Sequence, residues 1–566
     1  MKKIISMIGV ITIISLTSII LSFTIAADDN CQIRTIYVDD DNIDGPWDGS
    51  IENPFQFIQN GITASVSGDI VFVLNGVYNE NIMLNKSITL QGTNPNDTVI
   101  NGNKQKDTVT ILENQNTISG FTIINGGNVG IHIYSDHNHI DNCTVLDNYI
   151  GIYFEESNSN IVTHCNSSDN SVGIRIKSSD NNHIVKSSFY YNTGGFFIPS
   201  AGILISSGQK NIVNTCIFSQ NEVGISLGQS INNTLINNQL YRDGVSISGD
   251  TPSHFIHHIE NNTVNNKPLV FYLNQNNMLL DMGEVGQMIL VHCTNFSIID
   301  ACIINTSIGI ETAFCTNISV MNASISNCHR GIFFYNTTSS KISDCTLVQN
   351  NNGIDLINSD NNSIKKNTVS AEVIGIKIKE NSTDNIISHS DIFGCDRGIK
   401  IYQSSNNKVV YSNIFSNKEY GIRFFDSKNC EVSQCNVYLN ENEGIILHTL
   451  CDHNKIESCN ISKNEVGIHL IFSKENTVSN CTFEGKYPGV FLDYRSDFND
   501  ILTNNFIENE QHGYFYNSFF NRWNNNYWNE WNGYGPWIIK GRSKYYFPLF
   551  NFDWNPAKEP YAIIEG

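Results

Sequence analysis

The sequence predicts an all-β protein built as a parallel β-helix solenoid, and three periodic features lead to this prediction. A Gly-Ile dipeptide, or a close relative of it, returns about every 22 residues along most of the chain. Alternating apolar residues follow each glycine, and columns of Asn and Cys recur later in each period. A period of about 22 residues fits three short strands and three turns. We therefore expect about 20 stacked coils between about residues 75 and 520, because each coil buries its apolar side only against its neighbours.

The glycine column defines the coils. In its second run the glycines are 22 to 24 residues apart. A solenoid of helical repeats would need a period of about 33 residues or more. The column consists of Gly130, Gly151, Gly173, Gly202, Gly224, Gly309, Gly331, Gly353, Gly375, Gly398, Gly421, Gly444, Gly467, Gly489 and Gly513.

The residues after each glycine predict a strand with one face in the core. Ile376 and Ile378 alternate with charged residues, and later coils repeat the pattern. Strict alternation of β-branched residues is typical of a half-buried strand. If the coils stack in register, Ile376, Ile399 and Ile422 form one interior file.

Two polar or small-residue columns support the same register. Asn tolerates left-handed backbone angles and bonds to its own turn, so stacked Asn residues can form a ladder. Cys stacked about 4.8 Å apart could be bridged, but we favour a mostly unbridged column of small apolar groups. The Asn column is Asn138, Asn160, Asn182, Asn211, Asn233, Asn317, Asn362, Asn407 and Asn476, and the Cys column is Cys143, Cys165, Cys216, Cys345, Cys435, Cys459 and Cys481.

The N-terminal segment predicts export. Residues 1–27 begin with two lysines, continue as an apolar stretch and end in small residues, which is typical of a secretory signal peptide. The stretch is also long enough to be an uncleaved N-terminal anchor. Either way the body is expected to be extracytoplasmic, secreted or on the cell surface, with membrane contact only through this segment. The net charge of −21 argues against nucleic acid as a partner.

The remaining chain divides into caps and coils. Residues 28–74 form an N-terminal cap in which residues 55–64 read as a short amphipathic helix, since the end of a solenoid needs a cover. We expect β-helix over 75–250, distorted coils with an extruded loop over 251–300, and β-helix again over 301–520. Residues 521–566 contain five of the six Trp and form the C-terminal cap. The expected body is a single rod roughly 95 Å long.

One stretch of outward-facing positions suggests a binding site. Stacking places Lys377, Lys400 and Arg423 in one column about 5 Å apart, and like charges in register repel. The functional interpretation is a groove for an anionic glycan, in which cations bind carboxylates and rings stack on sugars. The alternative is a solvated strip neutralised by Asp355, Glu380 and Asp426. The candidate residues are Lys377, Lys379, Lys400, Tyr402, Arg423 and Phe425, with His448 and His469 beyond them.

An acidic turn near the N-terminus suggests a second, metal-binding possibility. Asp39, Asp40 and Asp41 are consecutive carboxylates that can bind calcium through oxygen. A solvated acidic turn is the alternative, and we favour it. The sequence implies no other cofactor.

The Gly-Ile coils resemble the right-handed parallel β-helix of the pectin-lyase-like superfamily. More narrowly, they are similar to the NosD-type repeats, also called the carbohydrate-binding and sugar-hydrolysis domain. The opening segment 36–41, the interruption 262–268 and the closing segment 551–561 look like the corresponding parts of secreted archaeal members. The resemblance covers nearly everything after residue 27 and implies the fold, whereas the superfamily hosts lyases, hydrolases, binding proteins and surface proteins.

Catalytic motifs do not transfer from these relatives. Similarity to polygalacturonases would require several motifs on consecutive coils, and only Arg175-Ile176-Lys177 is present. The leading hypothesis is a surface β-helix protein that binds polysaccharide or belongs to a surface layer without catalysis. A polysaccharide lyase or glycoside hydrolase is the second. An exported copper or metal accessory protein is the third, although no Met-rich or Cys/His-rich ligand motif supports it.

Overall fold

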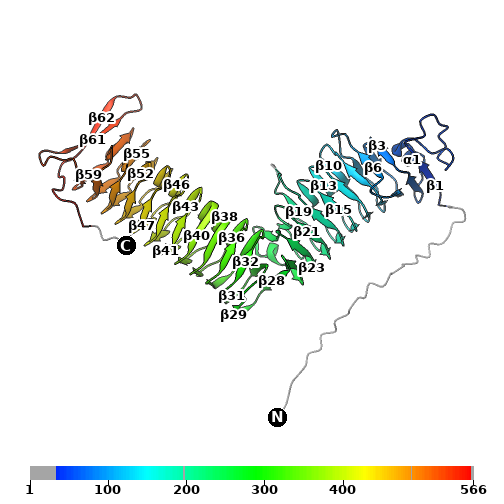
Figure 1. The fold of residues 1–566 in the computed structure, drawn as a ribbon, viewed down its shortest axis with the longest axis horizontal. Helices are drawn as coiled ribbons and strands as arrows, with labels where there is room; N and C mark the ends of the chain where they lie inside the picture. The colour runs from blue at the N-terminus through cyan, green and yellow to red at the C-terminus, as the bar shows by residue number, and fades with distance from the viewer. Residues whose placement is uncertain (1–32, 196–197, 486, 563–566) are drawn as a thin grey trace, which may run out of the picture.

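The computed structural model describes residues 33–195, 198–485 and 487–562. It confirms a right-handed parallel β-helix of about 21 turns (Figure 1). The described part contains two short helices, α1 (Ile58–Ala64) and the 3₁₀ helix η1 (Pro252–Phe255), and is otherwise strands and turns. Neither helix is long or apolar enough to cross a membrane. The predicted signal or anchor, residues 1–27, lies outside the described residues.

Each coil contributes one strand to each of three stacks. The strands that follow the glycine column form the Gly-Ile sheet, and its strands before the interruption pair in parallel from β4 to β25. These strands are β4 (Ile82–Leu84), β7 (Val109–Ile111), β10 (Val129–Ile133), β13 (Ile150–Glu155), β16 (Val172–Lys177), β19 (Ala201–Ser206), β22 (Ile225–Gly228) and β25 (Val245–Ser248). A second stack runs from β1 (Thr35–Val38) to β26 (His258–Glu260), and a third from β3 (Gly76–Tyr78) to β27 (Thr263–Val264).

The Gly-Ile sheet resumes after the interruption. Here β38 and β40 are long enough to join two stacks. Its strands are β28 (Lys267–Leu273), β30 (Gln287–Val291), β33 (Ile308–Ala313), β36 (Arg330–Tyr335), β38 (Thr346–Ile357), β40 (Thr368–Lys379), β43 (Arg397–Tyr402), β46 (Tyr420–Phe425), β49 (Glu443–His448), β52 (Val466–Ile471), β55 (Val490–Asp493) and β58 (Gly513–Tyr516). The other two stacks run from β29 (Asn276–Asp281) to β59 (Arg522–Asn524) and from β32 (Cys302–Ile304) to β60 (Tyr527–Trp528).

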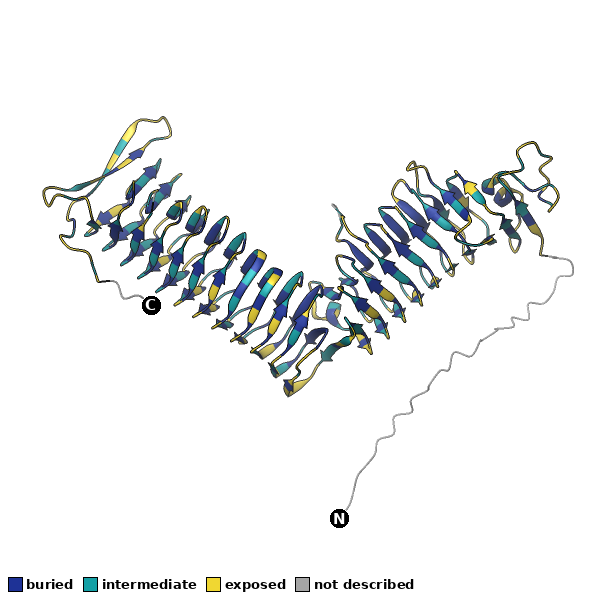
Figure 2. Ribbon diagram, in the orientation of Figure 1, coloured by how far each residue is buried: buried dark blue, intermediate teal, exposed yellow. Residues whose placement is uncertain are grey.

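The interior matches the predicted register. Ile376, Ile399 and Ile422 pair in sequence and are each fully buried, so they form one file. In Figure 2 buried residues follow the strands through both halves of the molecule. The apolar faces of neighbouring coils therefore cover one another, as the period requires.

The Asn column forms the predicted ladder, except that Asn317 is exposed and Ile318 occupies the ladder position in that coil. Asn385 donates through its backbone N–H and its side chain to Asn407 Oδ1, at 3.0 and 3.1 Å. Asn407 in turn donates to the carbonyl oxygen of Ser382 at 2.8 Å. The left-handed backbone position in this turn belongs to the preceding residue, Asn406, with φ of 61°. The ladder thus satisfies buried backbone groups at the turn.

The cysteines pack as small apolar groups. All of the cysteines within the described residues are unbridged, and each is buried except Cys302, which is intermediate. Cys435 and Cys459 belong to adjacent coils, and burial raises the pKa of Cys435. This is the mostly unbridged column that the sequence favours.

Both ends are covered. The predicted helix at residues 55–64 begins three residues later, as α1, and its Ile58 and Ile62 are buried. At the other end β61 (Trp537–Arg542) and β62 (Pro548–Asp553) form an antiparallel hairpin. Trp528 is buried there and donates from its indole N–H to Asp553. Trp523 and Trp528 therefore pack against the last coils, whereas Trp554 and several other aromatic residues of the tail are exposed.

The molecule is V-shaped rather than a single rod (Figure 1). The first arm ends at β27 and the second begins at β28. Asn265 and Asn266 both have positive φ, and β28 leaves this two-residue turn antiparallel to β27. Because such a turn reverses the chain, β28 does not continue the parallel ladder of the first arm. The coils of the second arm therefore stack along a different axis from those of the first arm.

Side chains join the two arms. Gln287 accepts from the N–H of Val245 at 2.8 Å and donates to its carbonyl oxygen at 2.5 Å. Glu311 accepts from the N–H of Ile247 at 3.3 Å. Phe255 of the first arm stacks on Tyr335 of the second, with ring centroids 5.3 Å apart. The open edge of β25 is thus closed by side chains instead of by another strand.

Candidate functional site

The Gly-Ile sheet lies along the inner side of the V in both arms. Figure 1 shows β10, β13 and β19 on this side of the first arm, and β43, β46 and β52 on this side of the second. Outward side chains of these strands stand two and four residues after each glycine. They form two continuous columns, which we call the inner face, because successive coils place equivalent residues about 4.8 Å apart.

The predicted cationic column is present on the inner face. Lys377 pairs in register with Lys400, and Lys400 with Arg423. In the second column Lys379 is followed by Tyr402 and then by Phe425. All six predicted residues therefore lie on three adjacent strands, β40, β43 and β46.

The aromatic members of this strip form a stacked ladder. The rings of Tyr402 and Phe425 are 5.1 Å apart at an interplanar angle of 16°. Phe425 and His448 continue the stack at 5.3 Å and 17°. Stacked rings of this kind present one flat edge beside the cationic column.

The cations differ in their partners. Lys377 lies 3.1 Å from the carboxylate of Asp355, and Lys379 pairs with Glu380. Within the described residues, neither Lys400 nor Arg423 has a carboxylate at ion-pair distance, and no such pair involves Asp426 either. Lys377 and Lys379 are thus neutralised by carboxylates, as expected for a solvated strip. Lys400 and Arg423 are not neutralised in this way.

Lys400 and Arg423 lie over aromatic rings instead. Lys400 Nζ is 5.7 Å from the ring centroid of Tyr402, and Arg423 Cζ is 5.9 Å from that of Phe425. Burial, followed by repulsion from Arg423, lowers the pKa of Lys400. An anion bound here would relieve that repulsion, because it supplies the opposite charge that the protein does not.

His469, further along the column, has a structural environment. Its Nδ1 is 3.4 Å from Glu443 and its Nε2 is 3.6 Å from Asp493. Burial disfavours the charged ring, but the neighbouring carboxylates of Asp493 and Glu443 outweigh this effect and raise the pKa of His469. This histidine is therefore committed to partners within the protein.

The three aspartates of the N-terminal turn do not converge on a common point. Asp40 accepts from the N–H of Val77 at 3.0 Å, whereas Asp39 accepts from the N–H of Asp41 at 3.1 Å. In the part of the chain that the structure describes, no group of three His, Cys, Asp or Glu side chains could hold a metal ion. These carboxylates serve the turn and its contact with the first coil.

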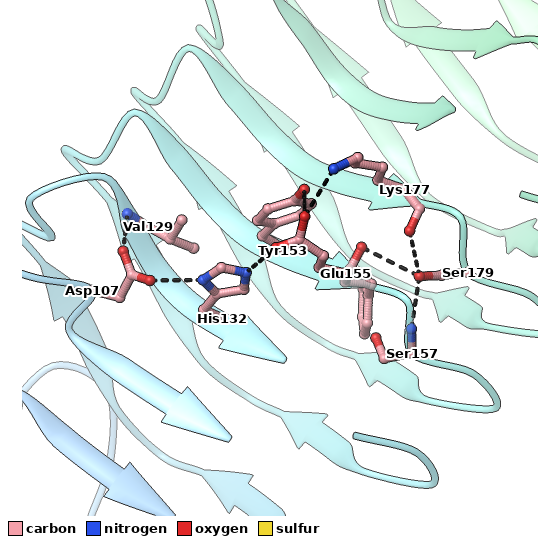
Figure 3. A network of polar contacts seen from close by, with 9 residues as sticks. Asp107, Val129, His132, Tyr153, Glu155, Ser157, Lys177 and Ser179 are labelled. Atoms are coloured by element: carbon pink, nitrogen blue, oxygen red, sulfur yellow. Dashed lines mark hydrogen bonds and ion pairs between the residues drawn. The ribbon is translucent and has the colours of Figure 1, made fainter. Parts of the chain in front are cut away.

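The first arm carries a polar network that the sequence analysis missed (Figure 3). His132 Nδ1 is 2.7 Å from Asp107 Oδ2, and its Nε2 is 3.3 Å from Glu155. Glu155 also accepts from Tyr153 at 2.8 Å and from Lys177 at 2.9 Å. The available signal was that the His, Tyr, Glu and Lys members of the network occupy the same outward columns as the Lys400 strip, whereas Asp107 comes from a turn.

The polar groups of this network are paired with one another. The His132 side chain is only 6% exposed, and its ring stacks on Tyr153 at 4.6 Å. Arg175 lies over the same tyrosine, with its Cζ 5.1 Å from the centroid of the Tyr153 ring. Each carboxylate is used by a neighbour, so the network ties coils together. Among the described residues, Arg175 on this arm also lacks a carboxylate at ion-pair distance, but Lys400 and Arg423 are two such cations in adjacent coils.

Family comparison agrees with this architecture. Residues 107–242 and 309–461, together more than half of the chain, match the family model of the right-handed beta helix region. The chain belongs to the right-handed β-helix family. Residues 409–542 of this β-helix protein also match a family model described as periplasmic copper-binding protein, NosD.

Individual relatives match over limited stretches or at low identity. A cell surface glycoprotein of Methanothermus fervidus is 37% identical over 99 residues, which are 17% of this chain and 16% of that protein. The chain thus spans about a sixth of that relative's length. The β-helix protein is extracytoplasmic, as the sequence predicts.

Two solved structures share the fold alone. A periplasmic alginate epimerase is 15% identical with a TM-score of 0.34, covering 56% of this chain and 75% of that chain. An alginate lyase from Paenibacillus is 12% identical with a TM-score of 0.24, covering 67% and 99%.

Proposed function

We propose that this surface β-helix protein binds an acidic polysaccharide along the inner face of its second arm, without catalysis. The observation that carries the proposal is the pair Lys400 and Arg423, two adjacent cations that have no carboxylate partner within the described part of a protein of net charge −21. A chain of uronate residues supplies carboxylates for both cations, and Tyr402 and Phe425 offer a ring edge for sugar contacts.

The carboxylates around the strip offer no pair suited to glycosidic hydrolysis. Glycosidic hydrolysis uses two carboxyl groups about 5 to 9.5 Å apart across the scissile bond. The carboxylate of Asp355 is fully buried and is held by Lys377 and Arg330. Glu380 is held by Lys379. Neither group is therefore available as a free acid and base pair.

The test is a calorimetric titration with an oligogalacturonate, using cellohexaose as the neutral control. We expect Lys400→Ala with Arg423→Ala to weaken binding by roughly 100-fold, since each charged hydrogen bond contributes about 1.5 to 3 kcal/mol. Binding to the natural protein should also weaken as salt increases. Lys408→Ala is the matched control, because Lys408 is exposed and paired with Glu431 on another sheet.

Two results would overturn the proposal. The first is undiminished binding by the double variant. The second is release of an unsaturated uronide or of new reducing ends that stops in that variant, which would make the protein a lyase or a hydrolase. The NosD match leaves a copper accessory role as a third possibility, and a copper titration with stoichiometric binding would support that role instead.

A further inference from the structure

The junction of the two arms encloses a pocket of about 400 Å³. Ser226 and Ser246 line it from the first arm, and Ser307, Arg330, Phe333 and Tyr335 line it from the second. Its volume is at the lower end of the range of about 300 to 1,000 Å³ for small-molecule sites. The pocket faces the inner side of the V and adjoins one end of the Lys400 strip, because its lining residue Glu380 pairs with Lys379.

The walls of this pocket are held by the contacts that join the arms. Gln287 and Glu311 bind the backbone of β25, which carries Ser246. Phe255 packs between Phe314 and Tyr335, at 5.3 Å from each ring. A pocket whose walls are bonded to one another is preorganised, so a ligand does not have to order it.

The pocket contains polar groups that no protein group satisfies. Ser307 is 3% exposed, and its hydroxyl has no hydrogen-bond partner within the described chain. The Nε of Arg330, another lining residue, is also buried and forms no hydrogen bond, although it lies at ion-pair distance from Asp355. Buried polar atoms are nearly always paired in proteins, so unpaired atoms gathered at one cavity indicate a missing partner.

The charges of the pocket select against an anion. Glu222 and Asp250 line it, and neither has a cationic partner among the described residues. Arg330 is the one guanidinium in the lining, and it lies 3.4 Å from Asp355, which is already fully buried. A carboxylate-bearing ligand would thus meet two free carboxylates and a cation that is already paired.

The remaining lining suits a sugar ring. The Phe333 ring is covered by Arg330, whose Cζ lies 4.5 Å from the ring centroid, and it is tilted by 43° to the Tyr335 ring. The half-buried Tyr335 ring therefore forms the aromatic wall of the pocket. Serine hydroxyls and free carboxylates offer donors and acceptors for hydroxyl groups opposite that wall. Aromatic wall and convergent polar groups are the usual composition of a small-ligand site.

We propose that this junction pocket binds a single neutral sugar unit, by packing it against Tyr335 and bonding its hydroxyls to Ser307, Glu222 and Asp250. The site would take a different ligand from the acidic-glycan strip that it adjoins, and it would bind this ligand at the place where the arms meet.

The experiment is a calorimetric and saturation-transfer titration of the full protein with methyl glucoside, methyl mannoside and methyl galactoside. Galacturonic acid serves as the anionic arm. Ser226→Phe fills the pocket without removing a core residue, and Tyr335→Ala removes one stacking surface. Ser206→Phe is the matched control, because Ser206 is an outward serine of β19 that does not line the pocket.

We expect one-site binding of at least one neutral glycoside, a loss of at least tenfold in affinity in Ser226→Phe and in Tyr335→Ala, and no change in Ser206→Phe. Unchanged binding in Lys400→Ala with Arg423→Ala would show that this site stands apart from the strip. Circular dichroism must show all variants folded. The proposal is overturned if no neutral glycoside binds, if both pocket variants bind normally, or if galacturonic acid binds more tightly than the glycosides.

Discussion

At Gly398 the backbones of adjacent coils approach so closely that no β-carbon fits. A Cβ built on Gly398 would lie 2.4 Å from the carbonyl oxygen of Gly421, and equivalent glycines meet the next glycine in the same way. Gly398 does not have a positive φ, so close packing between coils, rather than backbone freedom, explains why glycine recurs with the coil period.

This explanation predicts the effect of a single methyl group. Gly398→Ala should destabilise the protein by about 1 to 3 kcal/mol, since overpacking shifts the backbone. Gly228→Ala is the control, because its nearest neighbour atom would be 3.7 Å from the new Cβ. Chemical denaturation of both variants measures the difference. Equal midpoints for the two variants would mean that the close approach does not set the glycine period.

At the scale of elements, the junction between arms is an exception to strand pairing. The last Gly-Ile strand of the first arm, β25, is completed by Gln287 and Glu311 side chains. Burial raises the pKa of Glu311 to about 8, and it raises that of Asp243, beside the same junction, to about 7. Arg330 is the charged group that acts on Glu311, and it opposes part of this rise.

The junction should therefore weaken as pH rises. A raised pKa means that the folded state holds its proton more tightly, so this contribution is fully present below about pH 4 and is lost by about pH 8. We expect the melting temperature to fall across this window, and Glu311→Gln with Asp243→Asn to flatten the dependence. Glu508→Gln, at an exposed site, should leave it unchanged. An identical pH profile in the double variant would contradict this account of the junction.

At the scale of the whole molecule, the interior could be predicted from the sequence and the shape could not. Alternation around Ile399 and the stacked Asn407 report repeated contacts, which every coil makes again. The bend arises once, at the turn of Asn265 and Asn266, and from single side chains such as Gln287. A feature that occurs once produces no repeat in the sequence. The single rod expected from the sequence was therefore wrong.

The Lys400 strip could be predicted only in part, because its ion pairs depend on individual side chains rather than on the repeat. Register placed Lys377, Lys400 and Arg423 in one column, and the structure agrees. Which cations are neutralised depends on which long side chains reach a carboxylate, and spacing along the chain does not show this. The His132 network, which uses Asp107 from a turn, was missed for the same reason.

The central claim is that the inner face of the second arm recognises an acidic glycan. The most direct measurement is a crystal structure of the protein with an oligogalacturonate. We predict sugar carboxylates against Lys400 Nζ and the Arg423 guanidinium, with the sugar chain beside Tyr402 and Phe425. A glycan bound at another face, with Lys400 and Arg423 left uncontacted, would contradict the account.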